Sequence, residues 1–169
     1  MERDRAMEIC ERALAASAAD QTTVHLGAGT SALTRFANNR IHQNVAEEGA
    51  GLEVRAFLGQ RTGIATGNDL SDSGVRDTVA RATELARLAE PDEKLGPLPA
   101  PQEIPQEVCG VAATANFGAD ERAAAVRAII AVAEDAGQTA SGACSVGVSA
   151  SATRSSANSS RCPKRNSAA

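Results

Sequence analysis

Residues 35–44 read Arg-Phe-Ala-Asn-Asn-Arg-Ile-His-Gln-Asn, and they place a tight turn inside a run of strand-forming residues. Asparagine tolerates positive φ, so the pair Asn38-Asn39 is typical of the turn of a β-hairpin. After the turn the side chains alternate, because Ile41, Gln43 and Val45 share one face of a strand and the residues between them share the other. The stretch therefore predicts an antiparallel hairpin centred on residues 38–39.

The period of two continues on both sides of this hairpin. In the next run, Leu52, Val54, Ala56 and Leu58 alternate with Glu53, Arg55 and Phe57. Gly59-Gln60-Arg61 follows as a second turn, and Thr22–Leu26 precedes the hairpin as a short strand. Together the runs predict an antiparallel or mixed sheet whose second face is exposed to solvent.

Two amphipathic helices flank the predicted sheet. Residues 2–19 carry apolar side chains at three- and four-residue spacing, with charges between them. A second helix is expected over residues 72–89, capped by Asn68-Asp69-Leu70-Ser71. Its predicted inward residues are Val75, Val79, Ala82, Leu85 and Ala86. Residues 1–90 are thus expected to form a complete α+β domain.

The chain beyond residue 90 is expected to contain three further segments. Five prolines make residues 91–107 an extended connector. Residues 108–150 form an incomplete second α/β unit, with a strand at 142–150 and a helix capped by Asp120 that ends at Gly137. The apolar face of that helix is expected to carry Val126, Ile129, Ile130 and Ala133. Residues 151–169 are rich in serine and basic residues, so we expect a disordered tail.

Composition narrows the class of protein. The 169 residues carry a net charge of −4 and only 2% aromatic residues, which argues against nucleic acid as a partner. No signal-peptide core and no stretch of membrane-spanning length is found. Cys10, Cys109, Cys144 and Cys162 lie far apart, as expected for reduced thiols. We therefore expect a cytoplasmic protein that does not bind membranes.

Two local motifs imitate ligand sites. Residues 27–32 match the dinucleotide fingerprint G-x-G-x-x-A, but the residues after them alternate instead of starting a helix. We therefore expect a glycine turn between two strands. Residues 69–74 imitate the start of a calcium loop, yet Ala80 stands where that loop needs a carboxylate. Helix capping accounts for this second motif.

No residue of the chain is predicted to be catalytic, to bind a cofactor or to ligate a metal. His25 and His42 are the only histidines, and neither is followed by glutamate, whereas a zinc site needs three or four converging ligands. Glu47-Glu48 and the acidic residues of 90–93 are explained by a solvated strand end and by an acidic connector.

Four segments in fixed order resemble the amino-terminal domain of the TldD/PmbA family. They are Arg35–Asn38, Ile41–Asn44, Gly51–Arg55 and Gly63–Ser71. The resemblance covers about residues 2–90 and continues with less specificity through 108–150. It implies a relation to zinc metallopeptidases that cut unfolded peptides, mature peptide antibiotics and degrade antitoxins, and that also carry the label modulator of DNA gyrase.

The resemblance also implies what this chain lacks. The family's zinc motif, His-Glu-x-x-x-His, does not occur in the sequence, so no catalytic residue of the family maps onto it. Zinc is expected in full-length catalytic relatives and no cofactor in this chain, which should be inactive alone. Its expected partners are TldD/PmbA-type subunits, in a homo- or hetero-oligomer, with peptide substrates in the full-length complex.

Two readings of this resemblance stay open. The chain is either an amino-terminal fragment related to the peptidases, or a non-catalytic interaction or oligomerisation domain of the silent partner subunit. For residues 151–169 we hypothesise a frameshift or truncation, which reading the encoding DNA in the other two frames would test.

Overall fold

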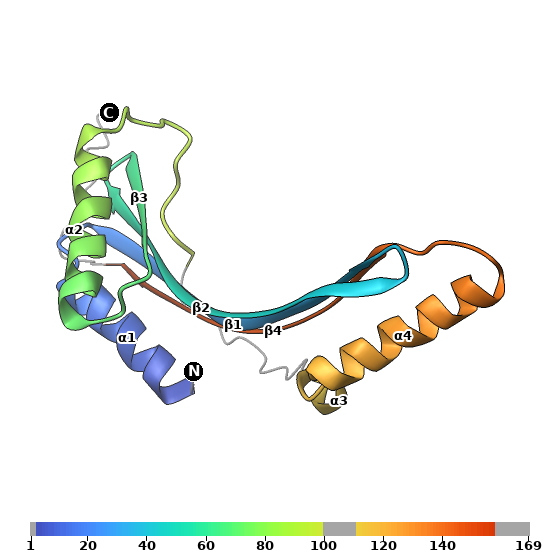
Figure 1. The fold of residues 1–169 in the computed structure, drawn as a ribbon. Helices are drawn as coiled ribbons and strands as arrows, with labels where there is room; N and C mark the ends of the chain where they lie inside the picture. The colour runs from blue at the N-terminus through green and yellow to red at the C-terminus, as the bar shows by residue number, and fades with distance from the viewer. Residues whose placement is uncertain (1–2, 100–110, 158–169) are drawn as a thin grey trace, which may run out of the picture. The chain divides into compact units, whose positions relative to one another are not determined.

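The computed structural model describes residues 3–99 and 111–157. Figure 1 shows the helices and strands within these ranges. In chain order they are α1 (Arg3–Ala16), β1 (Gln21–Ala37), β2 (Arg40–Leu58), β3 (Arg61–Gly67), α2 (Asp72–Leu88), α3 (Ala112–Ala115), α4 (Ala119–Asp135) and β4 (Gly142–Ala157). None of the helices in the described ranges is long and apolar enough to cross a bilayer.

The strands form one four-stranded sheet in the order β3-β2-β1-β4. β2 and β3 are antiparallel, and their register runs from Leu58 opposite Arg61 to Leu52 opposite Gly67. Both predicted turns are confirmed: Asn38 and Asn39 have φ values of 51° and 59°, and Gly59 has a φ of 58°. The predicted α+β class with a helix-flanked antiparallel sheet is also confirmed.

The chain divides into two compact units. Unit 1 contains residues 1–28, 50–104 and 150–169, and unit 2 contains residues 29–49 and 105–149. The boundary falls inside β1, β2 and β4, so each unit holds a part of these three strands. The predicted boundaries at residues 90 and 107 stay predictions.

Unit 1 has its core between the sheet and the helices α1 and α2. The predicted amphipathic first helix is confirmed, because Ile9, Cys10 and Ala13 of α1 are buried with Leu26 and Val54 of the sheet. Val75, Val79, Ala82 and Ala86 of α2 are buried in the same core.

The prediction for Leu85 was wrong, because its side chain is 48% exposed. Threonines take the buried positions on that part of α2. Thr78 and Thr83 each donate a hydrogen bond of 2.9 Å to the carbonyl oxygen four residues earlier, Gly74 and Val79 respectively. Their hydroxyl groups are thereby satisfied inside the core.

Unit 2 has a smaller core made by Phe36, Val126 and Ile130. Helix α4 starts after Gly118, so the prediction of Asp120 as its cap was wrong. Asp120 lies in the first turn, where a negative charge favours the amino end of a helix. The predicted end at Gly137 is confirmed, since Gly137 and Gln138 donate to the carbonyl oxygens of Glu134 and Ala133. Ile129 was predicted to face inward and is 51% exposed.

Two predictions about strands were also wrong. The expected glycine turn at 27–32 lies inside the continuous strand β1. A Cβ at Gly29 would lie 2.7 Å from the carbonyl oxygen of Val148, so glycine there lets β1 and β4 approach closely.

The predicted tail does not begin at residue 151, because β4 continues through Ala157. Its backbone pairs with β1, which does not require large apolar side chains. Residues 158–169 of the predicted tail lie outside the described residues. Residues 91–99 of the predicted connector contain no helix or strand, and residues 100–107 lie outside the described ranges. The short helix α3 was not predicted.

Candidate functional site

An open groove of about 490 Å³ lies on the sheet of unit 1. It is lined by His25, Gly27, Gly51, Leu52, Glu53, Thr66, Gly67 and Asn68. Leu52 is buried in the core, and its neighbours Gly51 and Glu53 point to the other face because side chains alternate along a strand. The groove therefore belongs to the face opposite helices α1 and α2, which was predicted to be solvated.

The polar side chains at the groove form hydrogen bonds within the sheet. His25 is exposed, and its Nδ1 lies 2.9 Å from the Oγ1 of Thr153 on β4. Glu53 accepts a hydrogen bond of 2.8 Å from Nε of Arg55 on its own strand. These side chains can donate and accept hydrogen bonds at the groove.

The second histidine contributes nothing to this groove. His42 is exposed on β2 in unit 2, whereas the groove and His25 belong to unit 1. Among residues 3–99 and 111–157, no three His, Cys, Asp or Glu side chains come together as possible metal ligands.

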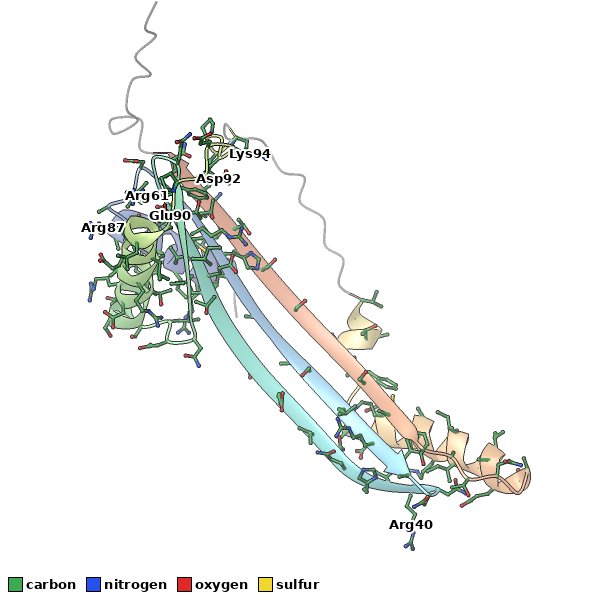
Figure 2. The ribbon with its side chains drawn as sticks, turned by 90° about the horizontal axis from the view of Figure 1, so that it is seen from above. Arg40, Arg61, Arg87, Glu90, Asp92 and Lys94 are labelled. Carbon is green, nitrogen blue, oxygen red and sulfur yellow. The ribbon has the colours of Figure 1, made fainter. Side chains whose placement is uncertain are left out.

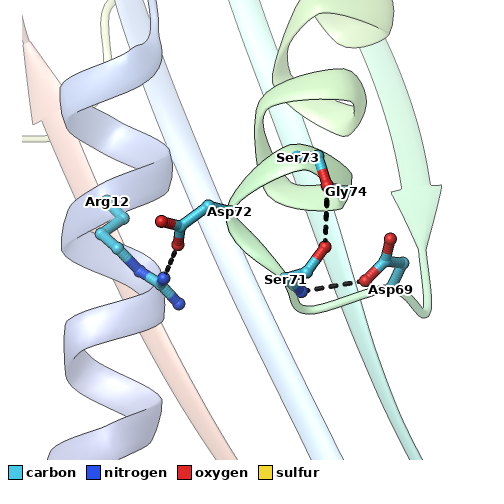
Figure 3. Close-up of polar contacts among 6 residues, drawn as sticks. All are labelled: Arg12, Asp69, Ser71, Asp72, Ser73 and Gly74. Carbon is cyan, nitrogen blue, oxygen red and sulfur yellow. Dashed lines mark hydrogen bonds and ion pairs between the residues drawn. The ribbon is translucent and has the colours of Figure 1, made fainter.

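The residues that imitate a calcium loop cap helix α2 (Figure 3). The Oγ of Ser71 accepts a hydrogen bond of 3.2 Å from the backbone N–H of Gly74, and Oδ1 of Asp69 accepts one of 2.9 Å from the N–H of Ser71. Hydrogen bonds from the backbone and side chain of Ser71 lower the pKa of Asp69. On the next residue, Asp72 forms an ion pair with Arg12 of α1. The predicted capping role is confirmed.

The acidic residues after α2 lie among basic ones. Figure 2 shows Glu90, Asp92 and Lys94 near Arg61 and Arg87. The backbone N–H of Asp92 donates to the carbonyl oxygen of Gln60 at 2.8 Å, which fixes this segment against the turn between β2 and β3. These carboxylates are exposed, as expected for a solvated acidic connector.

The turn at the tip of the β1–β2 hairpin is bound by the segment between α4 and β4. Oδ1 of Asn39 accepts a hydrogen bond of 2.7 Å from the N–H of Ala140, and its Nδ2 donates one of 3.1 Å to the carbonyl oxygen of Gln138. The N–H of Asn38 donates to Oγ of Ser141 at 3.3 Å. The asparagine pair in residues 35–44 thus makes the turn and also holds it in place.

A buried arginine lies behind the same hairpin. Arg122 of α4 is only 3% exposed and donates to three neutral oxygens. These are Oγ1 of Thr34 at 3.3 Å, Oδ1 of Asn44 at 3.0 Å and the carbonyl oxygen of Phe117 at 3.1 Å. The guanidinium group joins α4 to both strands of the hairpin.

Sequence reasoning missed the roles of Arg122, Thr34 and Asn44. The sequence did contain one indication that Arg122 is buried. Arg122 lies four residues before Val126 and eight before Ile130, on the apolar face of its helix. A charge at such a position needs buried acceptors. The partners come from strands 78 and 88 residues away, so no local pattern could identify them.

Cys10 is buried under β4. Its Sγ lies 4.0 Å from the carbonyl oxygen of Ala152. Burial raises the pKa of the thiol, with Arg154 acting in the opposite direction. Cys10 and Cys144 are both free cysteines, as predicted. Burial and a raised pKa make Cys10 a structural residue.

The chain matches one known family over its central strands and α2. Residues 26–86 match the family model described as PmbA/TldA metallopeptidase domain 1. Over these residues the chain is similar to the first domain of TldD/PmbA family members. This match includes the four segments on which the resemblance was based, and the resemblance is confirmed.

Solved structures share the fold over a longer part of the chain than the family model matches. TldE from Thermococcus kodakarensis is 20% identical with a TM-score of 0.78, and the match covers 89% of this chain and 35% of that one. A Thermotoga maritima protein described as a candidate modulator of a DNA gyrase is 12% identical with a TM-score of 0.72, with the same two coverages. A Bacteroides thetaiotaomicron protein of similar description is 14% identical, with a TM-score of 0.60, over 92% of this chain and 45% of that one. No curated protein matches the chain.

The chain corresponds to only part of each matched structure. The chain spans about a third of the length of the first two, at 35% each. At these identities the likeness concerns the fold.

Proposed function

We propose that this TldD/PmbA-type chain is a non-catalytic module of a peptidase system that acts on unfolded peptides in the cytoplasm. The observation that supports the proposal is the match of residues 26–86 to the first domain of the metallopeptidase family. In this proposal the module works in an oligomer with TldD/PmbA-type subunits, and zinc belongs to the catalytic subunit.

The chemistry of the histidines supports a non-catalytic role. Peptide hydrolysis by zinc requires three protein ligands and a polarised water. His25 interacts with Thr153, and His42 belongs to the other unit. The carboxylates of Glu90, Asp92 and Glu93 are exposed.

A peptidase assay tests the proposal. The purified chain is incubated with zinc and with unfolded casein, alone and together with a catalytic TldD-type subunit. We expect no hydrolysis by the chain alone and co-elution of the chain with the catalytic subunit in size-exclusion chromatography.

The His25→Ala/His42→Ala double variant is the matched control. Zinc-dependent hydrolysis that the wild-type chain shows and the double variant lacks would refute the non-catalytic role. Hydrolysis that both preparations share identifies a contaminating protease. Absence of any complex with TldD/PmbA-type subunits would refute the proposed assembly.

A second candidate is the interaction domain of a silent partner subunit. Exposed apolar side chains on α4 favour it, because Ile129 and Val132 are 51% and 71% exposed. This candidate predicts binding to the catalytic subunit that changes neither its zinc content nor the casein fragments it produces.

A further inference from the structure

Strand β4 is held in different ways in the two units. Its first part, residues 142–149, belongs to unit 2, and its last part, residues 150–157, belongs to unit 1. In unit 2, the side chain of Cys144 packs against the buried core of that unit. A Cβ at Gly142 would lie only 3.1 Å from Cζ of the core residue Phe36. The first part of β4 is therefore packed closely against a core.

The last part of β4 contributes little to the core of unit 1. We call residues 150–157 the strap. Of its residues 150–155, whose side chains the structure describes, Ala152 is half-buried and the others are exposed. Ala152 packs against the core, yet every buried member of that core lies between Ala6 and Ala86. Among the described side chains of the strap, one methyl group thus contributes to the core.

The hydrogen bonds made by the side chains around the strap are also weak. Nδ1 of His25 lies 2.9 Å from Oγ1 of Thr153, and both side chains are exposed, so water can replace either partner. The thiol of Cys10 donates to the carbonyl oxygen of Ala152 across 4.0 Å, and a thiol is a weak donor. The strap is therefore held mainly by the pairing of its backbone with β1.

We propose that the strap is a detachable strand, which leaves β1 as a unit while α1, α2 and the other strands of unit 1 stay folded. Segments with few buried apolar contacts open at a lower free energy than the core does. Opening uncovers the thiol of Cys10 and frees the edge of β1 around His25, whose backbone groups can then pair with another extended strand. The strap controls access to both.

Hydrogen exchange of the full wild-type chain tests the independent opening. Relative to the unstructured chain, the amides of residues 150–157 should exchange at least about tenfold faster than those of residues 142–149. The comparison is matched, because both parts belong to β4, whose neighbour in the sheet is β1. Equal protection of the two parts would overturn the proposal. Fast exchange confined to residues 155–157 would also overturn it, because only the end of the strand would then fray.

The reaction of Cys10 with iodoacetamide at pH 8 measures the same opening from the side of the core. Detaching one strand exposes little surface, so the rate should change less than about twofold between 0 and 1 M urea. Global unfolding exposes far more surface, and its population rises about tenfold per molar urea. A rate that follows this steeper dependence would show that Cys10 reacts only when the whole unit unfolds, which contradicts the proposal.

Ala152→Asp places a charge where the strap meets the core. We expect it to raise the labelling rate of Cys10 at least about tenfold, because an unpaired carboxylate is unfavourable there. Ser151→Asp is the matched control, since it adds the same charge at the exposed neighbouring residue, and it should label like the wild type. An unchanged rate in Ala152→Asp would refute the proposal. Loss of the helical circular dichroism signal in that variant would refute it too, because the core would then depend on the strap.

Discussion

Asn39 shows how one residue can serve the backbone and the tertiary structure together. Its φ of 59° requires a residue that tolerates the left-handed region, which glycine does better than asparagine. Its side chain also makes two hydrogen bonds to the segment between α4 and β4, which glycine cannot make. The two requirements together explain an asparagine at this turn.

Replacing Asn39 separates these two contributions. Asn39→Gly keeps the turn and loses two side-chain hydrogen bonds, so we expect a loss of about 1–2 kcal/mol in the free energy of unfolding. Asn39→Ala should lose about 1 kcal/mol more, because alanine is strained at positive φ. Urea unfolding of both variants measures the difference. Asn38→Gly is the control, since the hydrogen bond of Asn38 comes from its backbone, and a loss as large as that of Asn39→Gly would contradict the assignment.

Asp69 contributes to the stability of the fold in a way that depends on pH. Hydrogen bonds from Ser71 lower its pKa below the ordinary value of 3.8, so the folded state favours the charged form. A carboxylate with a lowered pKa stabilises the fold above its unfolded pKa, and this contribution disappears as the pH falls through the folded value.

We therefore expect Asp69→Asn to lower the thermal midpoint at pH 7 and to lower it less at pH 2.5. Differential scanning calorimetry at both pH values measures the change. Asp77→Asn, on the exposed face of the same helix, is the control. An equal deficit of Asp69→Asn at both pH values would show that the charge of Asp69 is irrelevant.

At the scale of elements, β3 and α2 pack through Gly63. A Cβ at this position would fall against the backbone atoms of Ala82 and Ala86, and it would lie 2.8 Å from the carbonyl carbon of Leu85. Backbone atoms of a helix cannot move aside as the end of a side chain can. Glycine at residue 63 therefore sets the distance between the strand and the helix.

Gly63→Ala should destabilise the chain by about 1–3 kcal/mol through overpacking. Gly51→Ala on the neighbouring strand is the matched control, because the new Cβ would meet only the carbonyl oxygen of Gly67 at 3.7 Å. Chemical denaturation of both variants provides the comparison. Equal stabilities of the two variants would argue against close packing at Gly63.

Arg122 joins the hairpin to α4, and its charge has no carboxylate partner among the oxygens it contacts. A buried cation with only neutral acceptors contributes little net stability, whereas its removal without replacement leaves a cavity. We expect Arg122→Ala to destabilise the folded chain by about 3–5 kcal/mol and Arg122→Met by clearly less.

Hydrogen exchange of the α4 amides in both variants tests this order, with Arg127→Met as the exposed control. Equal exchange in Arg122→Ala and in the wild type would show that the guanidinium group does not hold the helix.

The elements differ in how far the sequence alone predicts them. The hairpin at residues 38–39 and the cap at Ser71 were predictable because turn and cap chemistry is local. The course of β1 through Gly27–Ala32 was not, since its continuity depends on pairing with β4 more than a hundred residues later. The same holds for residues 151–157, whose small side chains carry no strand pattern of their own. The groove on the open face was missed because it needs three strands in register.

At the scale of the whole molecule, unit 1 combines the beginning of the described chain with its end. Cys10 of α1 is buried in the core of unit 1, and its thiol lies against Ala152 of β4, so β4 is one of the elements that shield it. Burial and a raised pKa both slow its reaction, because the thiolate is the nucleophile.

We expect iodoacetamide at pH 8 to modify Cys10 at least about a hundredfold more slowly than a cysteine in the unfolded chain. Cys144 is half-buried and should react faster than Cys10. Mass spectrometry of the modified peptides over time measures both rates. Equal rates at Cys10 and Cys144 would mean that β4 does not protect the thiol.

The order of the strands also determines which strands can pair while the chain is still being synthesised. β1, β2 and β3 are neighbours in both sequence and sheet, so they can pair as soon as the nascent chain exposes them. The flank of β1 that receives β4 must wait until more than a hundred further residues have been translated. During that interval β1 presents an unpaired edge, which makes it the place where a chaperone would be needed.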